Sequence, residues 1–243
     1  MPQTKPRVLL LDIETSPILV WTWNLKPEYI PPCMIEKEWY ILCWSSKWLG
    51  SSKMSSARSY KGNDYQSMKK LHSLISKADI IVAQNGNEFD IKKILTRFIF
   101  HKMKPPSKFR TVDTLKVAKG KFAFTSNSLN ELGRFLEVGT KAETGGFETW
   151  KRCMKDDPVA FKKMMKYCSQ DVLLLERVYA KMLPYIDKHP HMGILEGRYT
   201  TCKNCGSSNI HSRGYGINNI GKYNKYQCRD CGAWGSTKTV KVA

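Results

Sequence analysis

An apolar strand that ends in two carboxylates limits what this chain can fold into. Residues 7–14 read Arg-Val-Leu-Leu-Leu-Asp-Ile-Glu, and so apolar a run is typical of a buried strand. Side chains two positions apart lie on the same side of a strand, so Asp12 and Glu14 should project together. Adjacent carboxylates repel each other and lose hydration unless a cation lies between them. A second interpretation remains open, in which the strand has already ended and both acids cap a turn.

The pattern beyond this strand predicts a mixed α/β fold. Early consecutive strands, followed by alternating strands and helices, indicate a mixed β-sheet flanked by helices. The chain has 243 residues, enough for one substantial domain and a small second one. Asp64 and Ser128 are expected to cap helices, and Pro158 to begin one. Strands or extended segments are expected at 18–23, 40–48, 51–59, 80–84 and 109–117, and helices at 64–77, 88–103, 128–136 and 158–183.

Two further acids stand at positions that a packed core disfavours. Asp90 follows the short strand 80–84, and Asn85-Gly86 permits a tight turn that would bring it over the end of that strand. An Asp near a helix N-terminus is also simply favourable for the helix dipole. Asp171 falls on the apolar side of the helix at 158–183, with Tyr167 one turn earlier. A buried hydrogen bond between Asp171 and Tyr167 is the alternative explanation for that pair.

Together these segments resemble the DEDD (DnaQ-like) 3′–5′ exonucleases, which have the ribonuclease H-like fold. The Tyr-x-x-x-Asp form is similar to the tyrosine subgroup, because Lys166 stands where the histidine form has His. The resemblance covers about residues 5–190 and is to stand-alone exonucleases related to the proofreading domain of family B DNA polymerases, although the chain has no polymerase domain. The matching motifs are Asp12-Ile-Glu14-Thr15, Asn85-Gly-Asn-Glu-Phe89-Asp90 and Tyr167-Cys-Ser-Gln-Asp171.

The resemblance implies hydrolysis of phosphodiester bonds with two divalent metal ions. Hard Mg²⁺ or Mn²⁺ ions prefer oxygen ligands, which carboxylates supply. Asp113, a fifth acid in a family-like position, is expected to be structural. By resemblance, Asp12, Glu14 and Asp171 would hold one metal, and Asp12 and Asp90 would hold the second. Tyr167 would orient the attacking water. The substrate would be contacted by Thr15, Asn85 and Phe89.

Four cysteines near the C-terminus have the spacing of a zinc ribbon. Cys202 and Cys205 form one C-x2-C pair, and Cys228 and Cys231 form another after 22 intervening residues. Two such pairs complete a tetrahedral Cys₄ site for one structural Zn²⁺. Disulfides or redox-active pairs are the alternatives. The other cysteines, at 33, 43, 153 and 168, lack ligand spacing and are expected to be buried thiols. We therefore expect a nuclease domain at 1–196 and a zinc ribbon at 197–243.

The charge of the chain favours a polyanionic partner. The net charge is +19, with 32 basic against 20 acidic residues in 1–197 and eight against one in 198–243. An excess of lysine also increases solubility, so the net charge alone does not establish that the partner is a polyanion. In the tail, Arg213, Arg229 and the run from Lys222 to Tyr226 mix basic and aromatic residues, which suits a single strand. A purely structural role, or the binding of a partner protein, remains the alternative for the ribbon.

The sequence therefore predicts a metal-dependent 3′–5′ exonuclease acting on single-stranded nucleic acid, DNA more than RNA. A 3′–5′ exoribonuclease or a short-oligonucleotide nuclease is the alternative on the same fold. A non-catalytic nucleic-acid-binding adaptor is the alternative of another class. No apolar window approaches the ~18 residues of a membrane span, and no signal peptide is evident, so a cytoplasmic location, in a bacterium or a phage-infected cell, is expected. Tryptophans 21, 23, 39, 44 and 48 are expected to belong mostly to the core, with some stacking on bases.

Overall fold

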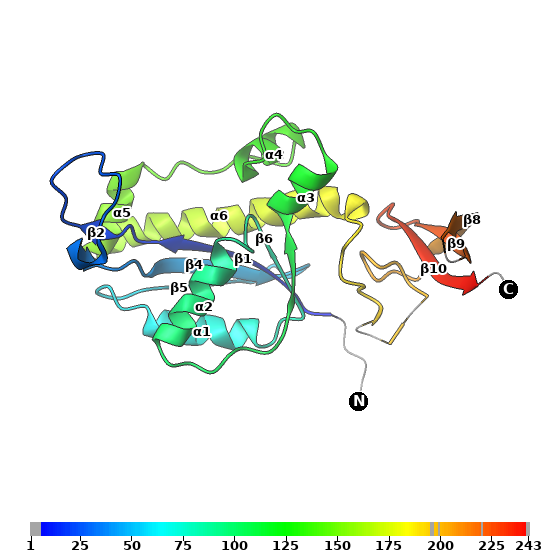
Figure 1. The fold of residues 1–243 in the computed structure, drawn as a ribbon, viewed down its shortest axis with the longest axis horizontal. Coiled ribbons are helices and arrows are strands. Elements are labelled where there is room, and N and C mark those ends of the chain that lie inside the picture. Colours follow the sequence, from blue (N-terminus) through cyan, green and yellow to red (C-terminus); the bar gives the residue numbers. More distant parts are fainter. Residues whose placement is uncertain (1–5, 195–196, 199, 220, 242–243) are drawn as a thin grey trace.

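A central five-stranded sheet organises the chain in a computed structural model that describes residues 6–194, 197–198, 200–219 and 221–241 (Figure 1). The strand order is β5-β4-β1-β6-β7. The pairs β1–β4 and β4–β5 are antiparallel, whereas β6 is parallel to β1 and β7 is parallel to β6. The predicted mixed sheet is confirmed. Its strands are β1 (Val8–Thr15), β4 (Ile41–Trp48), β5 (Met54–Arg58), β6 (Ile80–Ala83) and β7 (Arg110–Asp113).

Helices cover both faces of this sheet, and the strand β1 contributes to both cores. Val8 and Leu10 pack towards the long helix α6 (Pro158–Met182), together with α3 (Thr114–Lys121) and α4 (Leu129–Phe135). Leu9, Leu11 and Ile13 pack towards α1 (Tyr65–Ile75) and α2 (Asp90–Phe100) on the other face. A further helix, α5 (Phe147–Met154), packs against the first half of α6. The alternation of β1 therefore decides which side chains face α6.

The helix α6 forms as its sequence predicts. Pro158 is its first residue, and the Asp157 side chain accepts hydrogen bonds from the backbone N–H groups of Val159 and Ala160. These bonds satisfy two donors that a helix start leaves without a partner. The predicted apolar stripe is fully buried, and it comprises Met164, Cys168, Val172, Leu175, Tyr179 and Met182.

Two sequence-based element predictions are wrong in part. Of the strand expected at 18–23, only β2 (Leu19–Val20) forms, because its partner β3 (Ile35–Lys37) is itself only three residues long. The segment expected to stay extended from 109 to 117 ends as a strand at Asp113. The Asp113 side chain accepts hydrogen bonds from the N–H groups of Leu115 and Lys116, which starts α3. The helix α5 is not among the predicted elements.

The tryptophans divide between core and surface. Trp44 is fully buried and donates a hydrogen bond to the carbonyl of Ser67, and Trp39 and Trp48 pack partly buried against the same core. Trp21 and Trp23, by contrast, are 70% and 92% exposed. The expectation of a mostly structural role therefore holds for three of the five.

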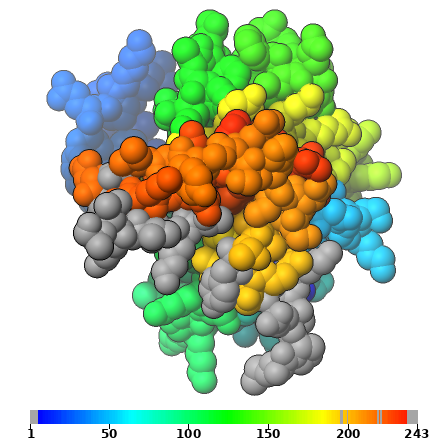
Figure 2. Space-filling view, turned by 90° about the vertical axis from the view of Figure 1, so that its right-hand side faces the viewer, coloured from blue at the N-terminus to red at the C-terminus, as the bar shows by residue number. Residues whose placement is uncertain are grey.

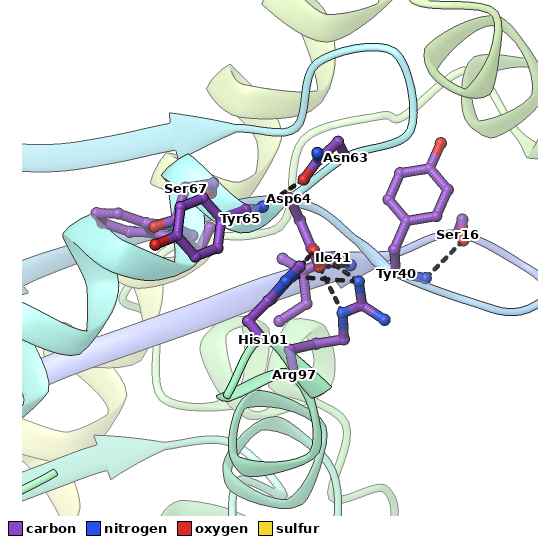
Figure 3. Close-up of polar contacts among 10 residues, drawn as sticks. Ser16, Tyr40, Ile41, Asn63, Asp64, Tyr65, Ser67, Arg97 and His101 are labelled. Atoms are coloured by element: carbon purple, nitrogen blue, oxygen red, sulfur yellow. Dashed lines mark hydrogen bonds and ion pairs between the residues drawn. The ribbon is translucent and has the colours of Figure 1, made fainter. Parts of the chain in front are cut away.

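Asp64 immediately precedes α1, where a cap is expected, yet its side chain makes no cap hydrogen bond. It is fully buried and accepts instead from Arg97 Nε and Nη2 at 2.8 and 2.7 Å and from the N–H of Ile41 at 3.0 Å (Figure 3). His101 Nε2 lies 2.6 Å from the same carboxylate. This cluster joins the start of α1 to the last turn of α2 and to the start of β4.

A second, three-stranded antiparallel sheet follows α6 and lies beyond its C-terminal end (Figure 1). Its order is β10-β9-β8, from β8 (Ile210–Asn218), β9 (Gly221–Cys228) and β10 (Trp234–Lys241). Asn204 attaches this part to the segment just after α6, because its side-chain amide donates to the carbonyls of Leu183 and Ile186 at 2.6 and 3.2 Å. The expected domain boundary at Glu196 lies outside the described residues, and the two-domain division stays a prediction.

Among the helices of the described ranges, none combines the length and the apolar character that crossing a membrane requires.

Candidate active site

Three carboxylates from distant parts of the chain meet beside β1. Val8 and Leu10 face α6, so the same alternation turns Asp12 and Glu14 towards that helix. Asp171 lies on the buried side of α6 and is 1% exposed. One carboxylate oxygen from each of Asp12, Glu14 and Asp171 lies within 4.8 Å of the others. The strand has not ended at these acids, since β1 continues to Thr15, and the turn interpretation is wrong.

A tight turn after β6 places the fourth acid next to this group. Asn85 has a φ of 60°, and a Cβ on Gly86 would lie 2.4 Å from that of Ala83, so only glycine fits there. The buried Asp90 follows at the start of α2, and its Oδ1 accepts a hydrogen bond from the N–H of Ile13 at 3.2 Å. Asp90 therefore lies against the strand residue between Asp12 and Glu14.

Asp113 supports this turn. Its carboxylate accepts hydrogen bonds from the backbone N–H groups of Asn85 and Asn87 at 3.0 and 3.1 Å, besides those from the first turn of α3. With four backbone donors on its two oxygens, this acid has a structural role, as the sequence led us to expect.

The electrostatics of the site favour a bound cation. Burial, and then the charge of Asp171, raises the pKa of Asp12 to about 7. Burial followed by the charges of Asp12 and Asp171 raises the pKa of Glu14 to about 8. Burial also raises the pKa values of Asp90 and Asp171, and the charge of Asp12 adds to the effect on Asp90. Each ionised carboxylate is thus disfavoured until positive charge compensates the group.

The side chains at this site are also suitable ligands for a divalent metal ion. Asp12 Oδ2 and Asp171 Oδ1 are buried and have no hydrogen-bond partner among the residues that the structure describes. Buried oxygens without a partner are costly, and a cation would satisfy both. Carboxylate oxygens are the ligands that Mg²⁺ and Mn²⁺ prefer. Asp12, Glu14 and Asp171 are therefore suited to hold such an ion.

Lys141 is a member of the site that the sequence did not reveal. Its Nζ donates to Asp171 Oδ2 at 2.6 Å and to the Tyr167 hydroxyl at 3.0 Å. Burial alone would lower the pKa of Lys141, but the hydrogen bonds to Asp171 and Tyr167 outweigh it and raise the pKa above its ordinary value. Lys141 lies outside the helices and strands, between α4 and α5, where no periodic pattern marks a residue as inward-facing.

Tyr167 lies one helical turn from Asp171, as the motif requires, and its hydroxyl oxygen accepts the hydrogen bond from Lys141. Burial raises the pKa of the phenol to about 12. Tyr167 is therefore protonated near neutral pH and offers an O–H donor, which suits orientation of a ligand rather than removal of a proton.

A groove lined mostly by residues with polar side chains, which we call the polar groove, adjoins the carboxylates. It is a cavity of about 630 Å³ between the end of β6, α3 and α4. Asn85, which is predicted to contact substrate, lines this groove. The other two predicted substrate contacts, Phe89 and Thr15, do not line it. Phe89 is exposed at the start of α2, and Thr15 is the last residue of β1. No acidic residue lines the groove among the described residues, and its polar side chains include Gln84, Asn85, Lys119, Asn127, Asn130 and Lys141.

The four C-terminal cysteines converge as their spacing predicts. Their Sγ atoms lie within 4.8 Å of one another, with 3.6 Å between Cys202 and Cys231 and 3.6 Å between Cys205 and Cys228. Four sulfurs about 2.3 Å from a central zinc ion would be about 3.8 Å apart in a tetrahedron, close to these values. The cluster is thus able to form a zinc site. Of the other cysteines, 43, 153 and 168 are buried as expected, but Cys33 is exposed.

Comparison with known proteins identifies the family. A family model described as the RNase H superfamily matches residues 47–183. The chain belongs to the RNase H superfamily. The predicted ribonuclease H-like fold, a mixed sheet with flanking helices, is therefore confirmed. The matched residues include Asp90, Tyr167 and Asp171, whereas β1, with Asp12 and Glu14, precedes them. No curated protein matches the chain.

A solved structure supports the same fold. The family B DNA polymerase from the hyperthermophilic archaeon Pyrobaculum calidifontis superposes on 75% of this RNase H superfamily chain, with a TM-score of 0.57 and 17% sequence identity. At this identity the similarity is one of fold. The matched part is 25% of the polymerase chain, so this protein corresponds to about a quarter of that enzyme.

Proposed function

We propose that this protein is a metal-dependent 3′–5′ exonuclease that hydrolyses single-stranded nucleic acid, with DNA preferred over RNA. One observation carries the proposal: Asp12, Glu14 and Asp171 present carboxylate oxygens within 4.8 Å of one another, while Asp90 is held against Ile13. The nuclease class follows from the RNase H superfamily. The polarity and the tyrosine-type mechanism rest on the three motifs described above, including Tyr167-x-x-x-Asp171.

The chain's own residues would divide the work of hydrolysis. Asp12, Glu14, Asp90 and Asp171 would hold two divalent ions, which supply a nucleophilic water and stabilise the leaving 3′ oxygen when bound. The Tyr167 O–H would orient the attacking water. Lys141, fixed between Tyr167 and Asp171, would limit the repulsion among the carboxylates and add positive charge near the phosphate.

The polar groove is the route by which a strand would reach this centre. Its lysines, Lys119 and Lys141, are suited to phosphates, and its amide side chains can meet bases or sugars. The absence of acids along the described lining removes repulsion against a polyanion. Its contact with Lys141 makes it continuous with the carboxylate group.

A gel assay on labelled oligonucleotides tests the proposal. With Mg²⁺ or Mn²⁺, a 5′-labelled single strand should give a ladder of shortened products, and a 3′-labelled strand should release labelled mononucleotide first. Asp12→Asn should lower the rate about a thousandfold or more, because it removes a metal ligand and its charge at nearly constant volume. Asp187→Asn, at an exposed acid outside the site, is the matched control.

The alternatives give distinct results in the same assay. Faster hydrolysis of RNA than of DNA would indicate an exoribonuclease, and activity confined to very short strands an oligonucleotide nuclease. Cleavage of a circular single strand would indicate an endonuclease. Binding without hydrolysis in either metal would indicate an adaptor and would contradict the proposal.

A further inference from the structure

The strand register sorts the side chains of the C-terminal sheet onto two faces. On β9, Tyr226 and Cys228 point to one side, where Tyr226 is buried in a cluster with Cys202 and Ala233. The Tyr226 hydroxyl accepts a hydrogen bond from the N–H of Lys203 at 3.1 Å, so the segment carrying the first cysteine pair covers this side. Tyr226, one of the aromatic residues that the sequence suggested for nucleic-acid contact, is therefore structural.

The opposite side carries a different set, which we call the open face. Gln227 alternates with Tyr226, and its register partners are His211 and Trp234. Arg213 Nη2 donates to Gln227 Oε1 at 3.0 Å, which places Arg213 over the same face despite the bulge in β8. The open face comprises His211, Arg213, Tyr223, Lys225, Gln227 and Trp234.

Glycine lets an aromatic ring lie flat on this face. A Cβ on Gly216 would come within 2.4 to 2.7 Å of the Tyr223 ring, so the ring lies directly across Gly216, its partner on β8. Trp234 is 53% exposed on the neighbouring edge strand. Two aromatic side chains are thus supported by the sheet on the same side.

The charge of the open face is positive. Arg213 and Lys225 lie on it, and Arg229, directly after β9, lies at its end with Nη2 3.1 Å from His211 Nδ1. Asp230, the single acid of residues 198–243, is engaged elsewhere: its carboxylate accepts hydrogen bonds from Ser207 and Asn209. Figure 2 shows residues of this sheet, in orange and red, lying across the front of the molecule.

We propose that the open face binds single-stranded nucleic acid, as an anchor separate from the carboxylate site. Arg213, Lys225 and Arg229 would contact phosphates, while Trp234 and Tyr223 would stack on bases, the combination by which proteins hold single strands without sequence preference. The choice of nucleic acid as occupant rests on the proposed nuclease function together with the lack of acids on the face.

The position of the anchor sets a length requirement. The chain rises about 18 Å along α6 from Asp171 to Leu183, the residue that follows the helix and to which Asn204 attaches the second sheet. A dinucleotide bound at the carboxylates is too short to reach the open face as well, whereas a longer strand can engage both. Binding at two linked sites strengthens association only for strands that span them.

Binding of a labelled single-stranded DNA of about 30 nucleotides to the inactive Asp12→Asn protein, carrying its zinc, tests this directly. Trp234→Ala should weaken binding about 5- to 100-fold, through loss of base stacking. Lys225→Ala should weaken it severalfold and reduce the slope of log K against log salt by about 0.7. The matched controls are Tyr215→Ala and Lys222→Ala. These two residues are exposed on the opposite side of the sheet, where Lys222 Nζ lies 3.8 Å from the centre of the Tyr215 ring. Both variants should bind the strand within about twofold of the parent protein.

Zinc content measured on each variant shows that the ribbon has remained folded. Equal losses for Lys225→Ala and Lys222→Ala, or equal affinity for duplex and single-stranded DNA, would overturn the proposal. With active protein, Lys225→Ala should slow hydrolysis of the long strand and leave that of a dinucleotide unchanged. Failure of the nuclease function alone would leave the binding differences intact, so the two proposals fail separately.

Discussion

Tyr167 and Asp171 occupy one face of α6, and Lys141 links their side chains. The Lys141 ammonium donates to both, so the Tyr167 oxygen is an acceptor in this bond and its O–H remains a donor. With its pKa raised to about 12, the phenol keeps that proton throughout the physiological range. The geometry thus favours a positioning role for Tyr167.

Tyr167→Phe removes the O–H and little else. We expect kcat for oligonucleotide hydrolysis to fall about ten- to a hundredfold, because the attacking water loses its orientation. KM and the Mn²⁺ concentration for half-maximal rate should change little, and the pH profile below about pH 10 should keep its shape. Steady-state kinetics over that pH range provide the measurement; unchanged turnover would remove the proposed role.

Lys141→Met tests charge compensation at the residue scale. Without the ammonium, the buried Asp171 faces Asp12 and Glu14 with less positive charge nearby, and we expect the protein in EDTA to lose about 1–3 kcal/mol of unfolding free energy. Mn²⁺ should reduce this loss, because a bound cation supplies the missing charge. Denaturant unfolding with and without Mn²⁺ measures both. The Lys141→Arg control keeps the charge, and an equal loss in EDTA and Mn²⁺ would instead indicate packing alone.

At the scale of elements, the cluster around Asp64 fastens α1, α2 and β4 to one another (Figure 3). Burial by itself raises the pKa of Asp64, but the hydrogen bonds from Arg97 and His101 outweigh it, and the pKa lies below its ordinary value. A carboxyl with a lowered pKa in the folded state stabilises the fold above its unfolded pKa. That contribution is lost as the pH falls through the folded value.

Arg97→Met should therefore destabilise the protein by about 3 kcal/mol at neutral pH, because it leaves a fully buried carboxylate without its main partner. The difference in unfolding free energy between this variant and the parent protein should become smaller below about pH 4. In that range Asp64 becomes protonated first in the unfolded state and then in the folded state. Urea unfolding at several pH values measures this. Arg134→Met, at an exposed ion pair with Glu131, is the control and should change stability by less than about 1 kcal/mol.

At the scale of the whole molecule, the C-terminal sheet contains a small core of its own. Its buried cluster consists of Cys202, Tyr226, Cys228 and Ala233, with the remaining cysteines packed against it. So small a core contributes little free energy, and a bound metal would supply most of the stability. The five-stranded sheet has two larger cores of its own, and we therefore expect it to stay folded without the metal.

Cys202→Ser should therefore release zinc and raise hydrogen exchange across 201–236, while the backbone of β1, β4 and α6 stays protected. Asn204→Ala offers the matched comparison, since it removes the bonds to Leu183 and Ile186 and leaves all four thiolates in place. Exchange measured by mass spectrometry, together with zinc content, distinguishes the two variants. Global unfolding of Cys202→Ser would contradict the predicted division into two domains.

The sequence by itself determined the features that depend on local periodicity. The alternation of β1 places Asp12 and Glu14 on one side, the helical period of α6 places Asp171 on its packed side, and the paired cysteines specify a metal-type cluster. In each case, a short stretch of chain fixes which side of an element is apolar, so a polar residue on that side is visible without coordinates.

The tertiary structure decided which distant groups meet. Lys141 belongs to a segment without a periodic pattern, and only the packing of that segment brings it to Tyr167 and Asp171. Asp64 looks like a helix cap until Arg97 of another helix reaches it. Whether Tyr226 or Tyr223 faces solvent depends on the register of β9 with its neighbours, because a shift of one residue exchanges the two faces of a strand. Such long-range choices are set by the joint packing of whole elements, which no local window of sequence contains.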